Sequence, residues 1–218
     1  MADPHCQCIG HGGASALAPA NTLASFDAAA DIGVDMVEFD VRAHRGELVL
    51  AHTLLDARSR TRVSLSTALK HFTSQRFRYV DINVDVKHTG CEAALLGELD
   101  AAGMLGRTLI SSQVPAVLDR IRELEPRVRV GISIGGRLAR ASRPWRDWRS
   151  QVLAGLASHR WDALMAQHRL VDGRLVQEVS ARDGRLCAWT VNKREAIQSL
   201  RTLGVHGITT ADPRLFSA

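Results

Sequence analysis

Short apolar runs alternate along the chain with longer segments whose apolar residues recur at helical spacing. The short runs are typical of buried β-strands, and the longer segments are typical of amphipathic helices. Strands are predicted at Cys6–Gly10, Met36–Arg42, Val80–Val86, Thr108–Ser112, Val128–Ile134, Ala163–Ala166, Leu186–Thr190 and Gly207–Thr210. Helices are predicted from Asn21 to Ile32, from Ser64 or Ser66 past Phe72, and at Cys91–Ala102, Pro115–Leu124, Arg143–Leu156, Leu175–Ala181 and Arg194–Leu203.

Eight strands, most of them followed by a helix, indicate an α/β fold with a parallel sheet. In a chain of 218 residues this count predicts a single (β/α)8 TIM barrel, with a doubly wound open sheet as the alternative. The sequence shows no internal repeat, low-complexity segment or linker, so we expect one barrel domain spanning residues 1–218.

Composition narrows the function classes. The 28 basic and 23 acidic residues give a net charge of +5, and only one tyrosine is present, so nucleic-acid binding is not expected. The chain has no apolar run as long as a membrane span and no signal-peptide pattern at its N-terminus. Its four cysteines are sparse and are expected to be free thiols, which fits a reducing, cytoplasmic setting.

Two carboxylates stand one residue apart in the strand predicted around Phe39. Glu38 and Asp40 would share one face of that strand, where they repel each other unless a cation or proton joins them. The simpler interpretation is an edge strand whose acids face water. Against it, Asp85 and Lys87 close the next predicted barrel strand, and in a barrel the strand ends converge on one rim.

Histidines flank this acidic pair on both sides in the sequence. His11 follows the first predicted strand, and His52 ends an extended run at Glu47–Ala51. Both would lie on the same rim as the acids. The residues together therefore predict a site with carboxylates, a lysine and two histidines.

The chain resembles the glycerophosphodiester phosphodiesterase family over nearly its whole length. The resemblance rests on six segments in order, namely Ile9–Ala14, Pro19–Thr22, Glu38–Val41, Leu50–His52, Asn83–Lys87 and Ala188–Asn192, and on the closing strand Gly204–Thr210. It implies a metal-dependent phosphodiesterase that hydrolyses glycerophosphodiesters to glycerol phosphate and an alcohol. A small anionic phosphodiester is the expected substrate.

The family's functional residues fall on named positions of this chain. The metal-binding acids fall on Glu38, Asp40 and Asp85, and one divalent cation, Mg²⁺ or Ca²⁺, suits such oxygen ligands. The catalytic histidines fall on His11 and His52. We assign His11 as the base and His52 as the acid, although the sequence alone leaves this order open.

The resemblance extends to the groups that would contact the substrate. Lys87 corresponds to the family's phosphate-side lysine, and Trp189 is expected to form a wall of the pocket. Gln113 and Gln167 close two predicted strands and are further candidates for substrate binding.

This chain departs from the family pattern at several positions. Gly12 stands where the family usually has Arg, and Ala20 stands where it usually has Glu, so we expect the missing pair to be partners. Asp85 replaces a Glu, Thr53 an acid, and Ala211 an Asp. These losses leave one cation fewer near the phosphate and leave the substrate preference open.

Two alternatives follow from these departures. Asp85–Gly90 is similar to the third strand of sphingomyelinase D-like phospholipases, so a phospholipase D-like lipid phosphodiesterase is one, with transient contact to a lipid surface. A barrel that binds phosphate esters with weakened turnover is the other.

Other signals carry less weight. Gly131–Gly135 matches a nucleophile elbow, so a serine hydrolase would use Ser133 with Asp172 or Asp183 and His206. The arginine-rich stretch 137–149 is expected to be a solvated helix face, or else a loop that guides an anionic substrate or lipid surface.

Overall fold

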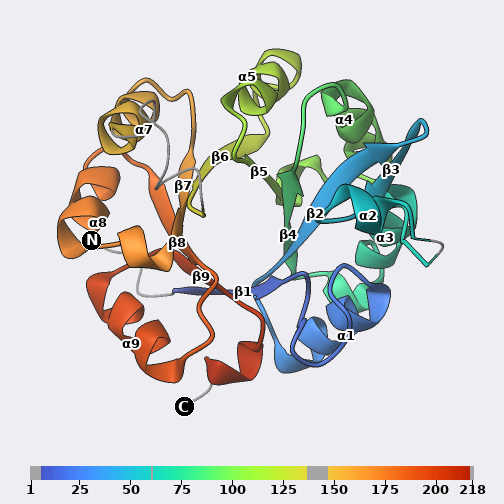
Figure 1. Cartoon of the computed structure of the whole chain (residues 1–218), viewed down its shortest axis with the longest axis horizontal. Coiled ribbons are helices and arrows are strands. Elements are labelled where there is room, and N and C mark those ends of the chain that lie inside the picture. The colour runs from blue at the N-terminus through green and yellow to red at the C-terminus, as the bar shows by residue number, and fades with distance from the viewer. Residues whose placement is uncertain (1–5, 60, 137–146, 217–218) are drawn as a thin grey trace.

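A closed barrel of parallel strands forms the centre of the molecule (Figure 1). The computed structural model describes residues 6–59, 61–136 and 147–216. The strands run β1-β9-β8-β7-β6-β5-β4-β2, and β1 pairs with β2 to close the ring. Their bounds are β1 Gln7–His11, β2 Met36–His44, β4 Asp81–Val86, β5 Thr108–Ser112, β6 Arg129–Ile134, β7 Ala163–Gln167, β8 Arg185–Trp189 and β9 Gly207–Thr210. The predicted (β/α)8 barrel is confirmed.

Helices surround the barrel between successive strands (Figure 1). The helices described are α1 Leu23–Ile32, α2 Leu54–Ala57, α3 Leu65–Phe72, α4 Glu92–Ala101, α5 Pro115–Leu124, α7 Trp148–Ala157, α8 Gly173–Ser180 and α9 Arg194–Leu203. Single-turn 3₁₀ segments lie at Gln75–Phe77, Leu105–Arg107, His168–Leu170 and Pro213–Leu215. No helix in the described parts of the chain is long and apolar enough to cross a membrane.

One strand lies outside the regular alternation. β3 (Glu47–Leu50) pairs antiparallel with the end of β2, after a turn in which Arg45 and Gly46 both have positive φ, 51° and 82°. Such a two-residue turn matches the twist of the strands that it joins. The chain then returns over the rim, where the Ala51 N–H bonds to the Asp40 carbonyl at 3.0 Å. The hairpin thereby brings His52 beside the strand that carries the acids.

The barrel interior changes from apolar to polar along its axis. Toward the N-terminal ends of the strands, six inward side chains form a small apolar cluster: Ile9, Met36, Leu109, Ala163, Met165 and Cys187. Between the barrel and its helices lies the main core, which includes a group of four buried rings, Phe26, Phe39, Phe72 and Phe77, with neighbouring centroids 5.0–5.6 Å apart. Removing one such ring costs about 3–5 kcal/mol of unfolding free energy. The apolar cluster closes one end of the barrel.

Most elements lie where the sequence predicts them, with two changes near the site. β1 continues through His11, one residue further than predicted. The first helix is capped by Thr22 and not by Asn21, because Asn21 has a positive φ of 60° and its side chain bonds to β2 instead. Part of the predicted helix Arg143–Leu156 lies outside the described residues, and α7 begins at Trp148.

Candidate active site

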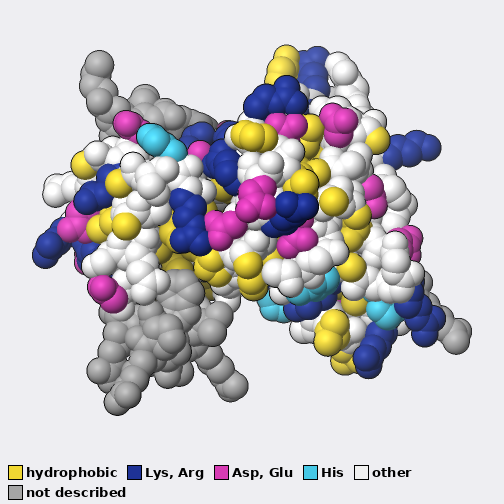
Figure 2. Space-filling model, turned by 90° about the horizontal axis from the view of Figure 1, so that it is seen from above, with side chains coloured by type: hydrophobic (Ala, Val, Ile, Leu, Met, Phe, Trp, Pro, Cys, Tyr) yellow, Lys and Arg dark blue, Asp and Glu magenta, His cyan; other side chains and the backbone are white. Residues whose placement is uncertain are grey.

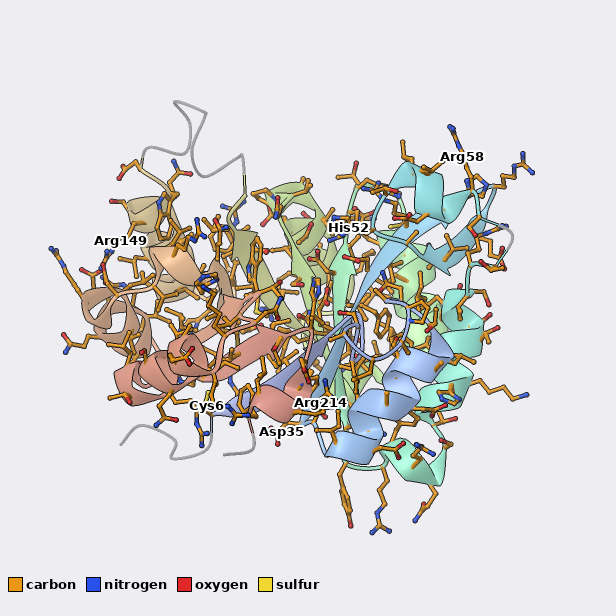
Figure 3. All side chains as sticks on the ribbon, turned by 60° about the horizontal axis from the view of Figure 1, so that its bottom comes forward. Cys6, Asp35, His52, Arg58, Arg149 and Arg214 are labelled. Atoms are coloured by element: carbon orange, nitrogen blue, oxygen red, sulfur yellow. The ribbon has the colours of Figure 1, made fainter. Side chains whose placement is uncertain are left out.

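A cavity opens at the C-terminal ends of the strands, at the rim opposite the apolar cluster. Its water-accessible volume is about 100 Å³, room for several waters or a small polar ligand. In Figure 3 the labelled His52 lies at this rim, and Cys6 and Asp35 lie at the other end of the barrel. The lining residues are His11, Glu38, Asp40, His52, Asn83, Asp85, Lys87, Ser111, Gln113, Ser133, Met165, Trp189, Thr190 and Thr209.

Three carboxylates converge at one side of the cavity. β2 and β4 pair so that Asp40 lies opposite Asp85, and Glu38 lies one inward position deeper on β2. Each of the three residues offers a carboxylate oxygen, and these oxygens all lie within 4.8 Å of one another. The predicted pair Glu38 and Asp40 is buried, so it is not an edge exposed to water.

The electrostatics of this cluster fit a bound cation. Burial, together with the charges of Asp40 and Asp85, raises the pKa of Glu38 well above its ordinary value, although the Gly12 N–H donates to its Oε2 at 3.1 Å. Three acids accompanied by one lysine leave negative charge in a buried place. A divalent ion with oxygen ligands would neutralise it, so Glu38, Asp40 and Asp85 are the residues that could hold one.

Asp40 is the centre of the hydrogen-bond network. Its Oδ2 accepts from Asn21 Nδ2 at 3.0 Å and contacts His52 Nδ1 at 3.2 Å, and its Oδ1 lies 2.5 Å from Lys87 Nζ. Burial would raise the pKa of Asp40, but the hydrogen bonds from His52 and Lys87 outweigh burial and hold that pKa below its ordinary value. Asp40 is therefore ionised.

Lys87 joins the two upper acids. Its ammonium forms ion pairs with both Asp40 and Asp85. Burial would lower the pKa of Lys87, but the charges of Asp85 and Asp40 raise it above its ordinary value. Lys87 is thus a fixed positive charge at the cavity wall.

The two histidines have opposite environments. His11 ends β1, and burial lowers its pKa below the ordinary 6.5. The side chain of His52 is 64% exposed at the mouth, and its hydrogen bond to Asp40 raises its pKa above 6.5. Because ionised Asp40 only accepts, His52 Nδ1 is the donor and Nε2 is left for another group. Histidines with pKa values on opposite sides of 6.5 suit paired proton transfer.

Comparison with known proteins identifies the family. The sequence model of the Glycerophosphoryl diester phosphodiesterase family matches residues 11–101 and 79–215, which together span nearly the whole chain. The chain belongs to this family. It is therefore a phosphoric diester hydrolase, and its acidic triad is consistent with the divalent-cation dependence of the family.

Individual relatives match this chain over most of its length. The glycerophosphodiester phosphodiesterase homologue YhdW of Bacillus subtilis (strain 168) is 23% identical over an alignment of 239 positions. The alignment covers 94% of each chain. A family structure from Agrobacterium tumefaciens superposes with a TM-score of 0.83 at 19% identity, over 96% of this chain and 95% of that one. An Oleispira antarctica phosphodiesterase in complex with the product sn-glycerol-3-phosphate superposes with a TM-score of 0.77 at 21% identity, over 97% and 95%.

The structure separates the two glutamines that the sequence singles out. Gln113 lines the cavity, whereas Gln167 is absent from its described lining, and its Oε1 accepts from the Gly136 N–H at 3.3 Å. Trp189 lines the cavity and donates from Nε1 to the Met165 carbonyl at 2.9 Å. A Cβ at Gly135 would lie 2.7 Å from the Trp189 ring, so glycine leaves room for that wall.

The two departures after β1 lie in contact. A Cβ built at Gly12 would meet the Ala20 Cβ at 2.9 Å, and the Asn21 N–H bonds to the Gly12 carbonyl at 3.1 Å. Gly12 has a φ of 56°, which disfavours a side chain. The two positions at which the sequence is expected to depart from the family pattern therefore lie close together in this structure.

Sequence reasoning missed several residues of the site. Asn21 forms two hydrogen bonds with Asp40. Asn21 Nδ2 donates to the Asp40 carboxylate, and the Asp40 N–H donates to Asn21 Oδ1 at 3.1 Å. Ser111 donates to Asp85 Oδ1 at 2.9 Å, and Asn83 Nδ2 donates to Ser111 Oγ at 3.0 Å. Asn83 lies two residues before Asp85, so the alternation of a strand predicts that both side chains point into the barrel. Ser111 lies opposite Asp85 on β5, which only the pairing of the strands shows.

The serine-hydrolase alternative is not supported by the placement of its residues. Ser133 lines the cavity near the end of β6, but His206 precedes β9 at the opposite end of the barrel, where its Nδ1 accepts from the Leu186 N–H at 3.1 Å. Asp172 caps α8 and pairs with Arg149. The proposed triad is therefore not assembled.

Of the arginine-rich stretch, residues 137–146 lie outside the described residues. Arg149, its last arginine, pairs with Glu178 at 2.8 Å and with Asp172 at 3.2 Å. These ion pairs connect α7 to α8. This placement fits the interpretation of Arg149 as part of a helix surface.

Proposed function

We propose that this chain hydrolyses glycerophosphodiesters to glycerol phosphate and an alcohol, with one divalent cation, Mg²⁺ or Ca²⁺, and with His11 and His52 as proton-transfer groups. The observation that carries the proposal is the meeting of three acids, Lys87 and both histidines in one cavity. The product named in the Oleispira antarctica complex, sn-glycerol-3-phosphate, fits the chemistry of that cavity.

His11 is the proposed general base. Its pKa is lowered by burial, so the ring is neutral near pH 7 and can accept a proton. The attacking oxygen belongs either to water or to a substrate hydroxyl next to the phosphate; in the second case a cyclic phosphodiester forms as the alcohol leaves, and water then opens it to glycerol phosphate. Removal of the proton from the attacking oxygen strengthens the nucleophile as the bond to phosphorus forms.

His52 is the proposed general acid. Asp40 holds the ring through Nδ1 and stabilises its protonated form, so Nε2–H can protonate the leaving alcohol. The exposure of His52 at the mouth supports this role, because the leaving alcohol would depart through the mouth. Lys87 offers a fixed positive charge to the phosphoryl oxygens. A divalent cation at the acids would act as a Lewis acid toward the same charge.

Product analysis tests this proposal. Phosphorus NMR of reactions with glycerophosphocholine and glycerophosphoethanolamine should show glycerol 3-phosphate, in amounts equal to the choline or ethanolamine released. The signal should disappear with excess chelator and in H11A and H52A. Folded wild-type protein that leaves every diester of such a panel intact with Mg²⁺ and Ca²⁺ would contradict the proposal and favour a phosphate-ester-binding barrel.

A lipid phosphodiester is the second proposed substrate class, because two exposed leucines follow closely after His52 in the chain. Leu54 and Leu55 of α2 are 58% and 76% exposed, and only Thr53 separates them from His52. In Figure 2 the strand-end rim forms the lower edge, and hydrophobic side chains protrude there beside basic ones. Transient contact with a lipid surface would use this edge. Faster turnover of a lysophospholipid than of glycerophosphocholine, lost in L54S/L55S, would favour this class.

A further inference from the structure

Four neutral polar side chains lie deep in the cavity, and one of them, Asn83, pairs in register with Glu38 across β4 and β2. Asn83, Ser111, Ser133 and Thr209 are buried, line the cavity, and come from β4, β5, β6 and β9. Two residues before Ser111, Ser133 and Thr209, the inward positions are Leu109, Gly131 and Gly207. Leu109 belongs to the apolar cluster, and the two glycines lie against other members of it. We call the four polar residues the cavity floor.

Two atoms of the floor are unpartnered. Asn83 is 1% exposed and Thr209 is 2% exposed. Within the described chain, neither Asn83 Oδ1 nor Thr209 Oγ1 has a hydrogen-bond partner. Buried polar atoms in folded proteins nearly always have one, so these two atoms are available to a water in the cavity or to a hydroxyl group of a ligand that displaces it.

The chemistry of the floor selects the kind of ligand group. Asn83 already uses its Nδ2 to donate to Ser111 Oγ and to the Leu109 carbonyl, so only its Oδ1 acceptor remains. Thr209 Oγ1 can both donate and accept. An acceptor and a neutral donor–acceptor in one cavity match the hydroxyls of an alcohol, whereas Lys87 and a cation at the three acids match the phosphate oxygens.

We infer that Asn83 and Thr209 form a hydroxyl-binding subsite for the glycerol part of the substrate, which is the part that keeps the phosphate. This inference rests on the proposed function and deepens it. The closed apolar end below the floor admits a short group such as glycerol, whereas the alcohol that leaves points to the open mouth at His52. The subsite would thus bind the glycerol part, which all glycerophosphodiesters share, and would not restrict the alcohol that leaves.

Thr209→Val tests the subsite, because it removes the hydroxyl and keeps the shape. Two substrates share the p-nitrophenyl leaving group and carry either glycerol or propane-1,2-diol, each through its terminal oxygen, on the phosphate, so that both keep the hydroxyl next to the phosphate and only the far hydroxyl differs. Wild type should prefer the glycerol ester in kcat/KM, and T209V should reduce that preference about tenfold, the effect of one lost hydrogen bond of about 1.4 kcal/mol. Thr209→Ser, which keeps the hydroxyl, should retain the preference.

The matched control is Thr210→Val at the next position. Thr210 is also buried, but its hydroxyl donates to Asn192 Oδ1 at 3.2 Å, away from the floor. T210V should lower Tm and keep the substrate preference. T209V should keep or raise Tm, because the hydroxyl it loses has no partner in the described protein. A folded T209V with unchanged preference would overturn the inference.

A binding measurement separates this inference from the proposed function. Glycerol 3-phosphate and n-propyl phosphate differ only in two hydroxyls, and calorimetric titration compares them without turnover. If wild type cleaves neither diester, the proposed function fails, and the titrations still decide the subsite. Tighter binding of glycerol 3-phosphate, lost in T209V, supports it, and equal binding of both phosphates to wild type contradicts it.

Discussion

The cavity has two unlike walls. Every ionisable side chain in its described lining lies between residues 11 and 87, on the side of β1, β2 and β4 and the segments after them. The wall from β5 to β9 is formed by neutral residues: Ser111, Gln113, Ser133, Met165, Trp189, Thr190 and Thr209. We call these the charged wall and the neutral wall.

The difference between the walls assigns them different tasks. On the charged wall, Asp40 is shared by Lys87, His52 and Asn21, so each charge stabilises its neighbours and the groups must be adjacent. The neutral wall adds no competing charge to the interactions opposite it. We therefore expect changes on the charged wall to remove turnover, and changes on the neutral wall to alter which substrate is preferred.

The largest expected effect is the loss of either histidine. H11A and H52A should each lower kcat by about 10²- to 10⁴-fold, because each removes one proton-transfer group. Steady-state kinetics with glycerophosphocholine measures this. The matched control is S133A on the neutral wall, which should lower kcat by less than about tenfold. If S133A were as damaging as H11A, the division between the walls would be wrong.

Lys87→Met should separate turnover from metal binding. Loss of the fixed charge should lower kcat about 10²- to 10³-fold, the effect of losing one group that stabilises transition-state charge. Metal affinity should increase, because Asp40 and Asp85 lose a positive partner. Kinetics and calorimetric cation titration measure the two effects, with K70M on the outer surface of α3 as the control. A K87M protein that binds metal more weakly than wild type would refute this account of Lys87.

Asn21→Gly should weaken cation binding by about 10- to 100-fold, the usual effect of losing a partner that orients a ligand. Glycine keeps the backbone at φ 60° without strain and removes only the two side-chain bonds to Asp40. Asn192→Gly, in which the lost amide bonds to Thr210 and Ala211 instead, is the control. Equal loss of metal affinity in both variants would show a general loosening rather than positioning of Asp40.

The pH dependence of kcat/KM should be the mildest effect, about tenfold per pH unit outside a plateau. Neutral His11 is needed as base, and its lowered pKa places the acid limb below pH 6.5. Protonated His52 is needed as acid, and its raised pKa places the alkaline limb above pH 6.5. H71Q changes a histidine that pairs with Asp27 outside the cavity and should leave the profile unchanged. A sharp maximum without a plateau would contradict the two pKa directions.

The charged wall was predictable from sequence far better than the neutral wall. Glu38, Asp40 and Asp85 are acidic residues at inward strand positions, a pattern with few other physical explanations. Ser111 and Thr209 are ordinary strand residues, and only the barrel's register shows that they face the cavity. Asn21 was misassigned as a helix cap because Asn suits both a cap and a left-handed turn, and the choice depends on the distant Asp40.

Gln167 is a residue that the sequence selects for the site although it is absent from the described lining of the cavity. It closes β7 as Gln113 follows β5, and the sequence treats the two alike, but backbone contact with Gly136 draws its side chain aside. Such distinctions depend on where a neighbouring loop returns, which local pattern does not encode.

Calorimetric titration of Mg²⁺ and of Ca²⁺ into chelator-treated wild type and Asp85→Asn protein tests the charged wall most directly. The account predicts one binding site per chain for at least one of these ions in wild type, with affinity at least about tenfold weaker in the folded variant. Wild-type protein that binds neither ion, or a folded variant that binds it as tightly as wild type, would contradict it.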